Sequence, residues 1–318
     1  MNTITASFTT SRKVHDMKRP NFFIVGAPKC ATTALYEYLK THPNIFMPSR
    51  MKEPCFFCED FPYQRRVESM DEYLQLFDDA NENHLIIGEA SVWYLYSKVA
   101  IQGLYEFNPD SKLVVMLRNP VEQVYAMHMQ CYIMHYDTKT DFEEAWRLQE
   151  NRKNGKDLPN PCKVEQFLQY KEIARYSSQI ERLLSIFPRD QVKFILFDDF
   201  KSNSRQVYLD VLDFHGLEDD NRHEFPVGNP SQRHKIQWLG DFLLDQPRWL
   251  EVLKSWVKRI FKIKKLTMIS SFIHKRNVEV GKREPLPPDL ITELKNEFRE
   301  DVARVSSLIQ RDLSHWCD

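Results

Sequence analysis

Short apolar runs recur along the chain, separated by longer stretches of helical periodicity. Four runs have the length of buried strands, at residues 21–26, 85–89, 112–117 and 192–197. They are apolar mainly at successive positions rather than at alternate ones, which is typical of strands covered on both faces. This pattern predicts a mostly parallel sheet with helices packed on each side.

The segments between these runs carry helical spacing. Leu35, Tyr38 and Leu39 follow the first run at such spacing, and 163–187 has a clear apolar side. Two later helices are predicted at the ranges 203–217 and 288–313. We therefore predict an α/β protein, a three-layer fold with a central mostly parallel sheet and helices on both faces. In such folds ligands bind beyond the carboxyl ends of the strands.

The 318 residues, 42% of them hydrophobic, are enough for a sizeable core. We expect a flexible N-terminus over 1–20 and a single domain over 21–318, with 235–285 as a cap over the site. No apolar span of about 18 residues and no secretory signal occurs, which predicts a cytoplasmic protein without a transmembrane segment.

Charge narrows the range of partners. The 44 Lys and Arg residues are balanced by 45 Asp and Glu residues, so a protein that coats nucleic acid is not expected. The stretch 235–276 alone combines many tryptophans and phenylalanines with lysines and arginines. Three readings of that stretch stay open: a helix in peripheral contact with a membrane, a site for an anionic acceptor, and a solvated basic face.

The loop after the first strand has the chemistry of an anion site. Lys29, Thr32 and Thr33 stand where a strand turns into a helix, whose first N–H groups carry a partial positive charge. The nucleotide-triphosphate loop pattern fails here, because Ala31 and Thr32 occupy the positions of its second glycine and its lysine. The loop therefore predicts phosphate binding of a different kind.

A second cation follows the third strand. Arg118 directly follows residue 117, where a guanidinium can bind a second phosphate with two parallel hydrogen bonds. A magnesium-dependent enzyme would favour an aspartate at such a strand end, and Asp198 and Asp199 follow the fourth strand. A nucleotide-dependent phosphotransferase therefore remains an alternative at this point.

Several segments together resemble one enzyme family. Residues 22–35 are similar to the 5′-phosphosulfate loop of sulfotransferases that use 3′-phosphoadenosine 5′-phosphosulfate (PAPS), in their heparan-sulfate-type and bacterial branch. Residues 112–122 resemble that family's 3′-phosphate motif. Residues 42–46 and 52–57 resemble its catalytic segment, and 298–316 resembles its last helix. The resemblance covers almost the whole chain.

The resemblance implies a P-loop-like fold and transfer of a sulfuryl group from PAPS to a hydroxyl or amine of a small-molecule or carbohydrate acceptor. The product would be 3′-phosphoadenosine 5′-phosphate (PAP), and no metal is required. Glu53 matches the general base and Arg118 the ligand of the 3′-phosphate. The residues matched to the 5′-phosphosulfate loop are Ala27, Pro28, Lys29, Cys30, Ala31, Thr32, Thr33 and Ala34.

The chain departs from the family pattern at four positions. Ala31 replaces a loop glycine, and Ala126 replaces a serine that binds the 3′-phosphate. The lost hydrogen bond would weaken donor binding by about 1.5–3 kcal/mol. Cys55 replaces a histidine, and Ala90 replaces a lysine of the heparan-type segment. Ala31 and Ala126 keep open a degenerate nucleotide-binding module without activity, and Ala90 makes a heparan-like acceptor less expected.

The roles of the remaining candidates follow from the chemistry. Lys29 would neutralise charge on the leaving phosphate, and Glu53 would take the acceptor proton within an apolar surrounding. His128 is a second candidate base on a helix that borders the site. Lys282, in a late loop, is a candidate to close over the phosphates of the donor. Cys55 and Cys58 have the spacing of metal ligands, but no second pair accompanies them.

Overall fold

A computed structural model gives the fold of residues 19–134, 136–159, 165–226, 232–234, 278–280 and 284–318. In this part of the chain the main sheet has five parallel strands in the order β2-β3-β1-β4-β5. The strands are β1 Phe22–Gly26, β2 Ile45–Phe46, β3 Ile86–Ala90, β4 Lys112–Leu117 and β5 Val192–Leu196. Two short strands, β6 Gln232–His234 and β7 Val278–Val280, pair antiparallel with each other.

The central strands explain the apolar runs in the sequence. Every residue of β1 is buried, and so is every residue of β4 after Lys112. The strands predicted at 21–26 and 112–117 are confirmed, whereas β3 lies one residue later than predicted and β5 ends at Leu196. Strand β2 was missed because two residues are too few to form a pattern.

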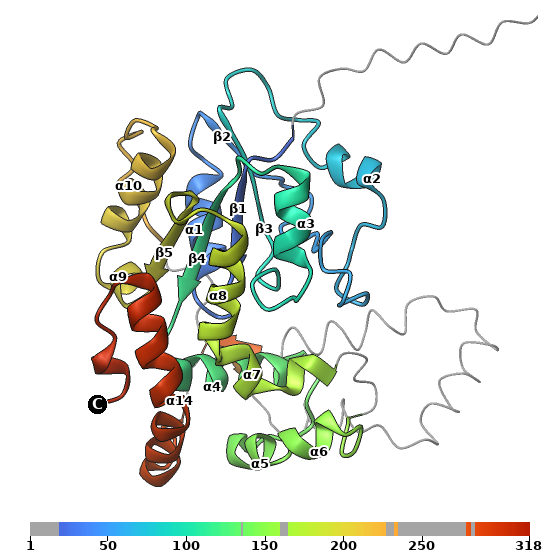
Figure 1. The fold of residues 1–318 in the computed structure, drawn as a ribbon, viewed down its shortest axis with the longest axis vertical. Coiled ribbons are helices and arrows are strands. Elements are labelled where there is room, and N and C mark those ends of the chain that lie inside the picture. The colour runs from blue at the N-terminus through green and yellow to red at the C-terminus, as the bar shows by residue number, and fades with distance from the viewer. Residues whose placement is uncertain (1–18, 135, 160–164, 227–231, 235–277, 281–283) are drawn as a thin grey trace, which may run out of the picture.

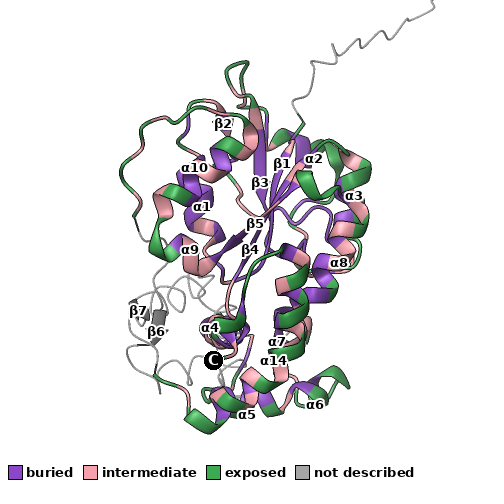
Figure 2. Cartoon of the chain, turned by 60° about the vertical axis from the view of Figure 1, so that its left-hand side comes forward, coloured by how far each residue is buried: buried purple, intermediate pink, exposed green. Residues whose placement is uncertain are grey.

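Helices cover both faces of the sheet, as predicted. Helices α1 and α10 lie on one face, and α3 and α8 lie on the other (Figures 1 and 2). Figure 2 shows that the strands and the inward sides of these helices are buried. The helices are α1 Thr32–Leu39, α2 Met70–Gln75, α3 Ala100–Phe107, α4 Pro120–Ile133, α5 Phe142–Arg147, α6 Gln149–Lys153, α7 Tyr170–Ala174, α8 Tyr176–Ile186, α9 Phe197–Ser202, α10 Ser204–His215 and α14 Pro288–Ile309.

A further group of helices lies beyond the carboxyl ends of the strands. The arrowheads of β4 and β5 point toward α4 and α14 (Figure 1). Helix α14 packs on both α8 and α4, and α4 also packs on α7. The loops that follow β1 and β4 therefore open toward α4, at the end of the sheet where ligands of α/β proteins bind.

Two of the predicted helices match closely and one does not. Helix α10 lies within the predicted range 203–217, and α14 lies within 288–313, ending where Gln310 adopts a left-handed φ of 57°. The helical pattern predicted at 163–187 is helical in the structure but is divided into shorter pieces. A 3-10 turn, α7 and α8 follow one another there, and Arg175, with ψ of 87°, separates the two α-helices.

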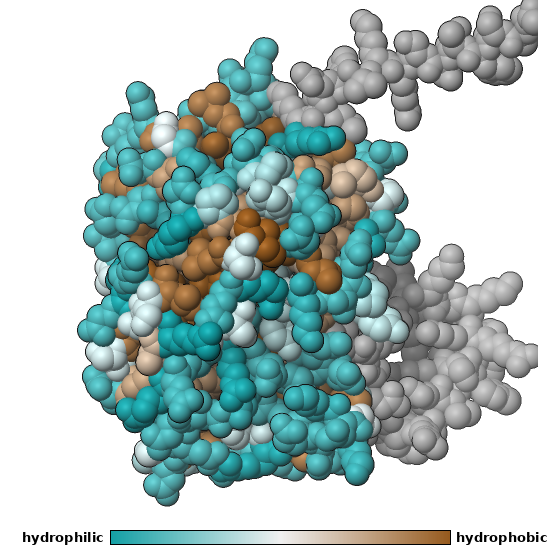
Figure 3. All heavy atoms as spheres, in the orientation of Figure 1, coloured by the Kyte–Doolittle hydropathy of each residue, from teal (hydrophilic) through white to brown (hydrophobic). Residues whose placement is uncertain are grey.

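The surface in the view of Figure 1 is mostly hydrophilic, with a hydrophobic strip near the β4–β5 side of the sheet (Figure 3). Among the described residues no helix combines the length and the hydropathy needed to span a bilayer. The predicted cap at 235–285 falls almost entirely outside the described residues, as does most of the N-terminus predicted to be flexible.

Candidate active site

The turn between β1 and α1 has a constrained backbone. Lys29 and Ala31 adopt left-handed φ angles of 65° and 67°, a conformation that costs a residue with a Cβ roughly 1–2 kcal/mol. A Cβ on Gly26 would lie 2.8 Å from the Cβ of Leu95, so glycine is required where the strand ends. The strained residues lie where the chain turns sharply from strand into helix.

Helix α1 begins at Thr32 directly after this turn. The N–H groups of its first turn have no carbonyl partner within the helix and give this end a partial positive charge. Thr33 is half-buried, whereas Thr32 is buried, so the hydroxyl of Thr33 is the more accessible one. The other loop side chains are also buried, namely Ala27, Pro28, Cys30 and Ala34. These residues therefore offer a ligand their backbone rather than their side chains.

Helix α4 holds the loop from one side. The Nζ atom of Lys29 donates to Oε1 of Gln130 at 2.9 Å. The Nε2 atom of Gln123 donates to the carbonyl of Pro28 at 3.2 Å. Two glutamines on one helix thus fix both the lysine side chain and the backbone just before it.

Arg118 lies beside the same loop. Its Nη1 atom is 3.4 Å from the carbonyl oxygen of Lys29, and its guanidinium lies 4.2 Å from the centre of the Phe197 ring. The Nε and Nη2 atoms donate to Oε2 of Glu122 at 2.8 and 2.6 Å. Lys29 and Arg118 therefore share one edge of the sheet, as the sequence argument required.

Glu53 follows β2 in the neighbouring part of the sheet. Its Oε1 atom is 2.7 Å from Nζ of Lys52, and 27% of its side chain is exposed. Two residues later, the amide of Cys55 donates to the Ser91 hydroxyl at 3.0 Å. The Ser91 amide in turn donates to the Ile24 carbonyl of β1 at 3.1 Å. The segment that carries Glu53 is therefore tied to the strand that leads into the Lys29 loop.

His128 lies in the core rather than on an open surface. Its residue exposure is 1%, and its Nε2 atom is 2.8 Å from the carbonyl oxygen of Lys139. Its ring packs beside those of Phe142 and Tyr170, and burial lowers its pKa. These contacts favour a structural role, and Glu53 is the better placed of the two candidate bases.

The two aspartates of the phosphotransferase alternative already have partners. Asp198 accepts a hydrogen bond of 2.7 Å from Nε1 of Trp316. Asp199 forms an ion pair of 3.0 Å with Arg311. Both carboxylates join α9 to the C-terminal segment, which argues against their use as magnesium ligands. Lys282, by contrast, lies outside the described residues.

Cys55 and Cys58 form a buried thiol pair. The neighbouring Cys55 thiol and burial both raise the pKa of Cys58, which favours the protonated form over the thiolate that binds metals. In the described ranges no group of three or more potential metal ligands comes together.

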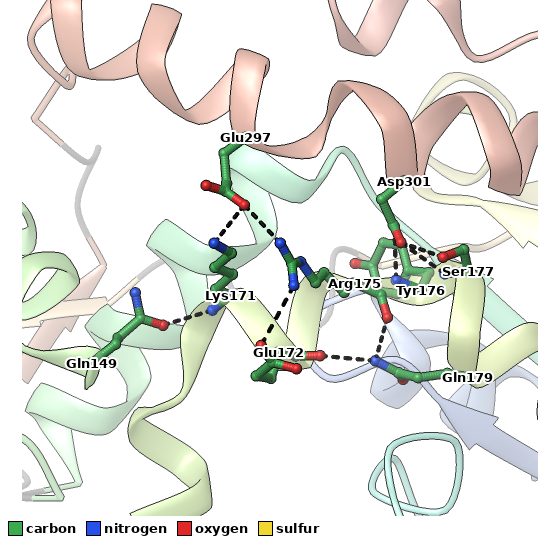
Figure 4. Close-up of polar contacts among 9 residues, drawn as sticks. All are labelled: Gln149, Lys171, Glu172, Arg175, Tyr176, Ser177, Gln179, Glu297 and Asp301. Atoms are coloured by element: carbon green, nitrogen blue, oxygen red, sulfur yellow. Dashed lines mark hydrogen bonds and ion pairs between the residues drawn. The ribbon is translucent and has the colours of Figure 1, made fainter. Parts of the chain in front are cut away.

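The C-terminal helix α14 holds the start of α8 in place. Asp301 on α14 accepts hydrogen bonds from the amides of Tyr176 and Ser177 at 2.9 and 3.2 Å, so it caps the start of α8 (Figure 4). Glu297, one turn earlier, accepts from Lys171 and Arg175 (Figure 4).

Tyr176, the first residue of α8, lies close to the loop that carries Lys29. The Tyr176 hydroxyl is 4.0 Å from Sγ of Cys30, whose thiol has its pKa raised to about 12 by burial. Contacts between α14 and α8 thus support the loop that carries Lys29.

Sequence reasoning missed several of these residues. Gln130 and Glu122 lie within α4 and contact Lys29 and Arg118. The spacing between Arg118 and Glu122 is that of an ion pair within one helical turn, so this pair could have been predicted. Nothing in the local sequence indicates the contact between Tyr176 and the loop.

Comparison with known proteins shows to which family the chain belongs. The sequence model of the sulfotransferase domain matches residues 19–237, more than half of the chain. The chain belongs to the sulfotransferase domain family. The resemblance inferred from the motifs is therefore confirmed.

The relatives act on carbohydrates according to their names. Mouse carbohydrate sulfotransferase 15 is 27% identical over 248 residues, covering 62% of this chain and 44% of that protein. Human bifunctional heparan sulfate N-deacetylase/N-sulfotransferase 3 is 26% identical over 295 residues, covering 86% of this chain and 31% of that protein. The chain thus spans less than half the length of these curated relatives.

A solved structure shows the same fold over nearly the whole chain. The sulfotransferase from Alicyclobacillus acidocaldarius is 29% identical, with a TM-score of 0.69, and the match covers 95% of this chain and 100% of that one. The α/β fold with a P-loop-like loop after β1 is therefore that of a sulfotransferase.

Proposed function

We propose that this chain transfers a sulfuryl group from PAPS to a hydroxyl or amine of an acceptor, with Glu53 as the general base. The observation that carries the proposal is the meeting of Lys29 and Arg118 at one edge of the sheet, with the carbonyl of one within 3.4 Å of the guanidinium of the other. Two cations beside a helix N-terminus suit a ligand with two separate phosphates. PAPS carries phosphate on both the 3′ and the 5′ oxygen.

The residues divide the chemistry between them. The acceptor oxygen or nitrogen attacks the sulfur atom while the bond from sulfur to the bridging oxygen of the 5′-phosphate breaks. The acceptor proton passes to the Glu53 carboxylate, and the electron pair of the broken bond leaves on PAP. Lys29 and the N–H groups of Thr32 and Thr33 stabilise the charge that grows on the leaving phosphate.

In the structure Lys29 and Arg118 are held by groups that a phosphate would replace. Gln130 accepts from Lys29, and Glu122 accepts twice from Arg118. Glu122 is an anion, and 54% of its side chain is exposed, so it can move aside into solvent. Donor binding then exchanges an exposed ion pair for a charge-assisted contact with phosphate.

A carbohydrate acceptor is supported by the relatives, whose names specify carbohydrate and heparan sulfate substrates. A sugar hydroxyl and a glucosamine amine both lose a proton on sulfation, so one general base serves either reaction. Ala90 in place of a lysine favours an acceptor less strongly anionic than heparan sulfate.

Calorimetric titration with PAP, compared with ATP with and without magnesium, tests the donor assignment. We expect PAP to bind without magnesium and to bind more tightly than ATP. Incubation with PAPS and a panel of acceptors, namely heparosan, its de-N-acetylated form, chondroitin and a simple phenol, then tests transfer by mass spectrometry of the sulfated product. Binding of PAP with no transfer to any acceptor would support the degenerate nucleotide-binding module, and tighter binding of magnesium ATP would overturn the proposal.

A further inference from the structure

Glu89 is a buried carboxyl group that the proposed reaction does not use. It lies in β3, in register with Phe23 of β1, and its exposure is 0%. Its Oε2 atom accepts a hydrogen bond of 3.3 Å from the Tyr94 hydroxyl, and the hydroxyls of Tyr73 and Ser91 also face it. A group so completely enclosed cannot touch an acceptor, so any effect on the reaction passes through its neighbours.

Those neighbours lead to the segment that carries Glu53. The Ser91 hydroxyl, which faces Glu89, accepts the Cys55 amide at 3.0 Å. Cys55 has a left-handed φ of 48°, a conformation that needs outside support in a residue with a Cβ.

The two tyrosines that face Glu89 contact the same segment through their rings. Tyr73 stacks on the Phe56 ring at 4.7 Å between centroids, and Tyr94 meets the Phe57 ring edge-on at 5.8 Å. Three successive residues after Pro54 are therefore held by groups gathered around Glu89.

We propose that Glu89 is a positioning residue for the Glu53 segment, acting through the Ser91 hydroxyl on the backbone of Cys55. This inference rests on the proposed function, in which Glu53 takes the acceptor proton. It assigns no chemical step to Glu89.

The charge state of Glu89 fits this role. Burial, with a further contribution from the negative charge of Glu53, raises the pKa of Glu89 to about 8. The ionisable or hydroxyl groups around it are Tyr36, Glu53, Cys55, Cys58, Tyr73, Ser91 and Tyr94. None of these carries a positive charge that would stabilise a carboxylate. A neutral Glu89 leaves the negative charge to Glu53, whereas its ionisation would set two carboxylates against each other.

Ser91→Ala tests the link without changing any charge. Ser111→Ala is the matched control, because Ser111 is also fully buried but lies before β4, at the opposite end of the sheet, and its hydroxyl has no hydrogen-bond partner among the described residues. We expect Ser91→Ala to speed hydrogen exchange in peptides spanning 52–58 and to lower the transfer rate about tenfold. PAP affinity should stay within twofold, and Ser111→Ala should change none of these.

Glu89→Gln tests the role of the neutral acid, since the amide keeps the shape but cannot ionise. We expect the wild-type transfer rate to fall above pH 8 and the variant to keep its rate there, with similar rates at pH 7. Superimposable pH profiles, or unchanged exchange of 52–58 in Ser91→Ala, would overturn the proposal. The hydrogen-exchange measurement needs no acceptor, so it tests the positioning of the Glu53 segment even if no transfer is detected. PAP binding tests the proposed donor site separately.

Discussion

The proposed donor side of the site, around Lys29 and Arg118, and its proposed base side, around Glu53, are built differently. On the donor side, Lys29 and Arg118 are cations that stay partly accessible and are held by side chains of α4. On the base side, the segment after Glu53 contacts Ser91, Tyr73 and Tyr94, three hydroxyl-bearing residues that surround the buried acid Glu89. In the proposed reaction, the donor side exchanges its internal partners for phosphate, whereas the base side keeps its contacts.

Glu53→Gln should give the largest effect, because it removes the proposed proton acceptor itself. We expect the transfer rate to fall by about 10²–10⁴-fold, with PAP affinity almost unchanged. Steady-state rates and PAP titration measure both quantities. Glu59→Gln, a nearby exposed glutamate, serves as the control. If Glu53→Gln kept the full rate, Glu53 could not be the general base, and the distinction between a donor side and a base side would be wrong.

Lys29→Ala should affect the donor side alone. Removing a charge that stabilises the leaving phosphate is expected to lower the rate by about 10²–10³-fold. Lys40→Ala is the control, since Lys40 sits at the far end of α1 and pairs only weakly with Glu37, at 3.9 Å. Comparable losses in the two variants would show that general charge, rather than the loop, governs the rate.

The buried acid predicts a dependence of stability on pH. Burial raises the pKa of Glu89 from its ordinary value of 4.5 to about 8. Between these values the folded protein keeps a proton that the unfolded chain has lost, so the free energy of unfolding falls as pH rises. The contribution of Glu89 is fully present below pH 4.5 and is lost by about pH 8.

Denaturant unfolding across this pH range measures the effect. Relative to Glu89→Gln, the wild type should lose about 1.4 kcal/mol of unfolding free energy per pH unit between these limits. Parallel curves for the two proteins would mean that Glu89 is ionised throughout this pH range. The base side would then not contain a neutral buried acid.

Ala31→Gly gives the smallest effect. Glycine relieves the left-handed φ of 67° at the start of α1, so we expect an increase in unfolding free energy of up to about 1 kcal/mol. Ala34→Gly, within the same helix, should lower it by about the same amount. Thermal unfolding of both variants checks the sign, and a loss of stability in Ala31→Gly would contradict the strain inferred for the loop.

The donor side was largely predictable from sequence, for a physical reason. Arg118 directly follows the buried strand β4, Lys29 lies in the loop directly after the buried strand β1, and parallel strands bring their carboxyl ends to one edge. Local pattern and fold class were therefore enough to place the two residues together.

The base side was less predictable because its contacts join distant parts of the chain. Cys55 bonds to Ser91 across 36 positions. The donor side has one contact of the same kind, since Asp301, which supports the Lys29 loop through α8, caps that helix across more than 120 positions. That contact lies at the break between α7 and α8, and the periodicity at 163–187 alone does not indicate it.

In the proposed function, Lys29 and Arg118 hold two different phosphates of one nucleotide. Calorimetric titration of the wild type and Arg118→Ala with PAP and with adenosine 5′-phosphate, which lacks the 3′-phosphate, tests this arrangement. We expect the wild type to prefer PAP by at least about tenfold, and we expect Arg118→Ala to lose this preference while still binding adenosine 5′-phosphate as before. An equal loss of affinity for both nucleotides would show that Arg118 does not bind the 3′-phosphate, and would contradict the account.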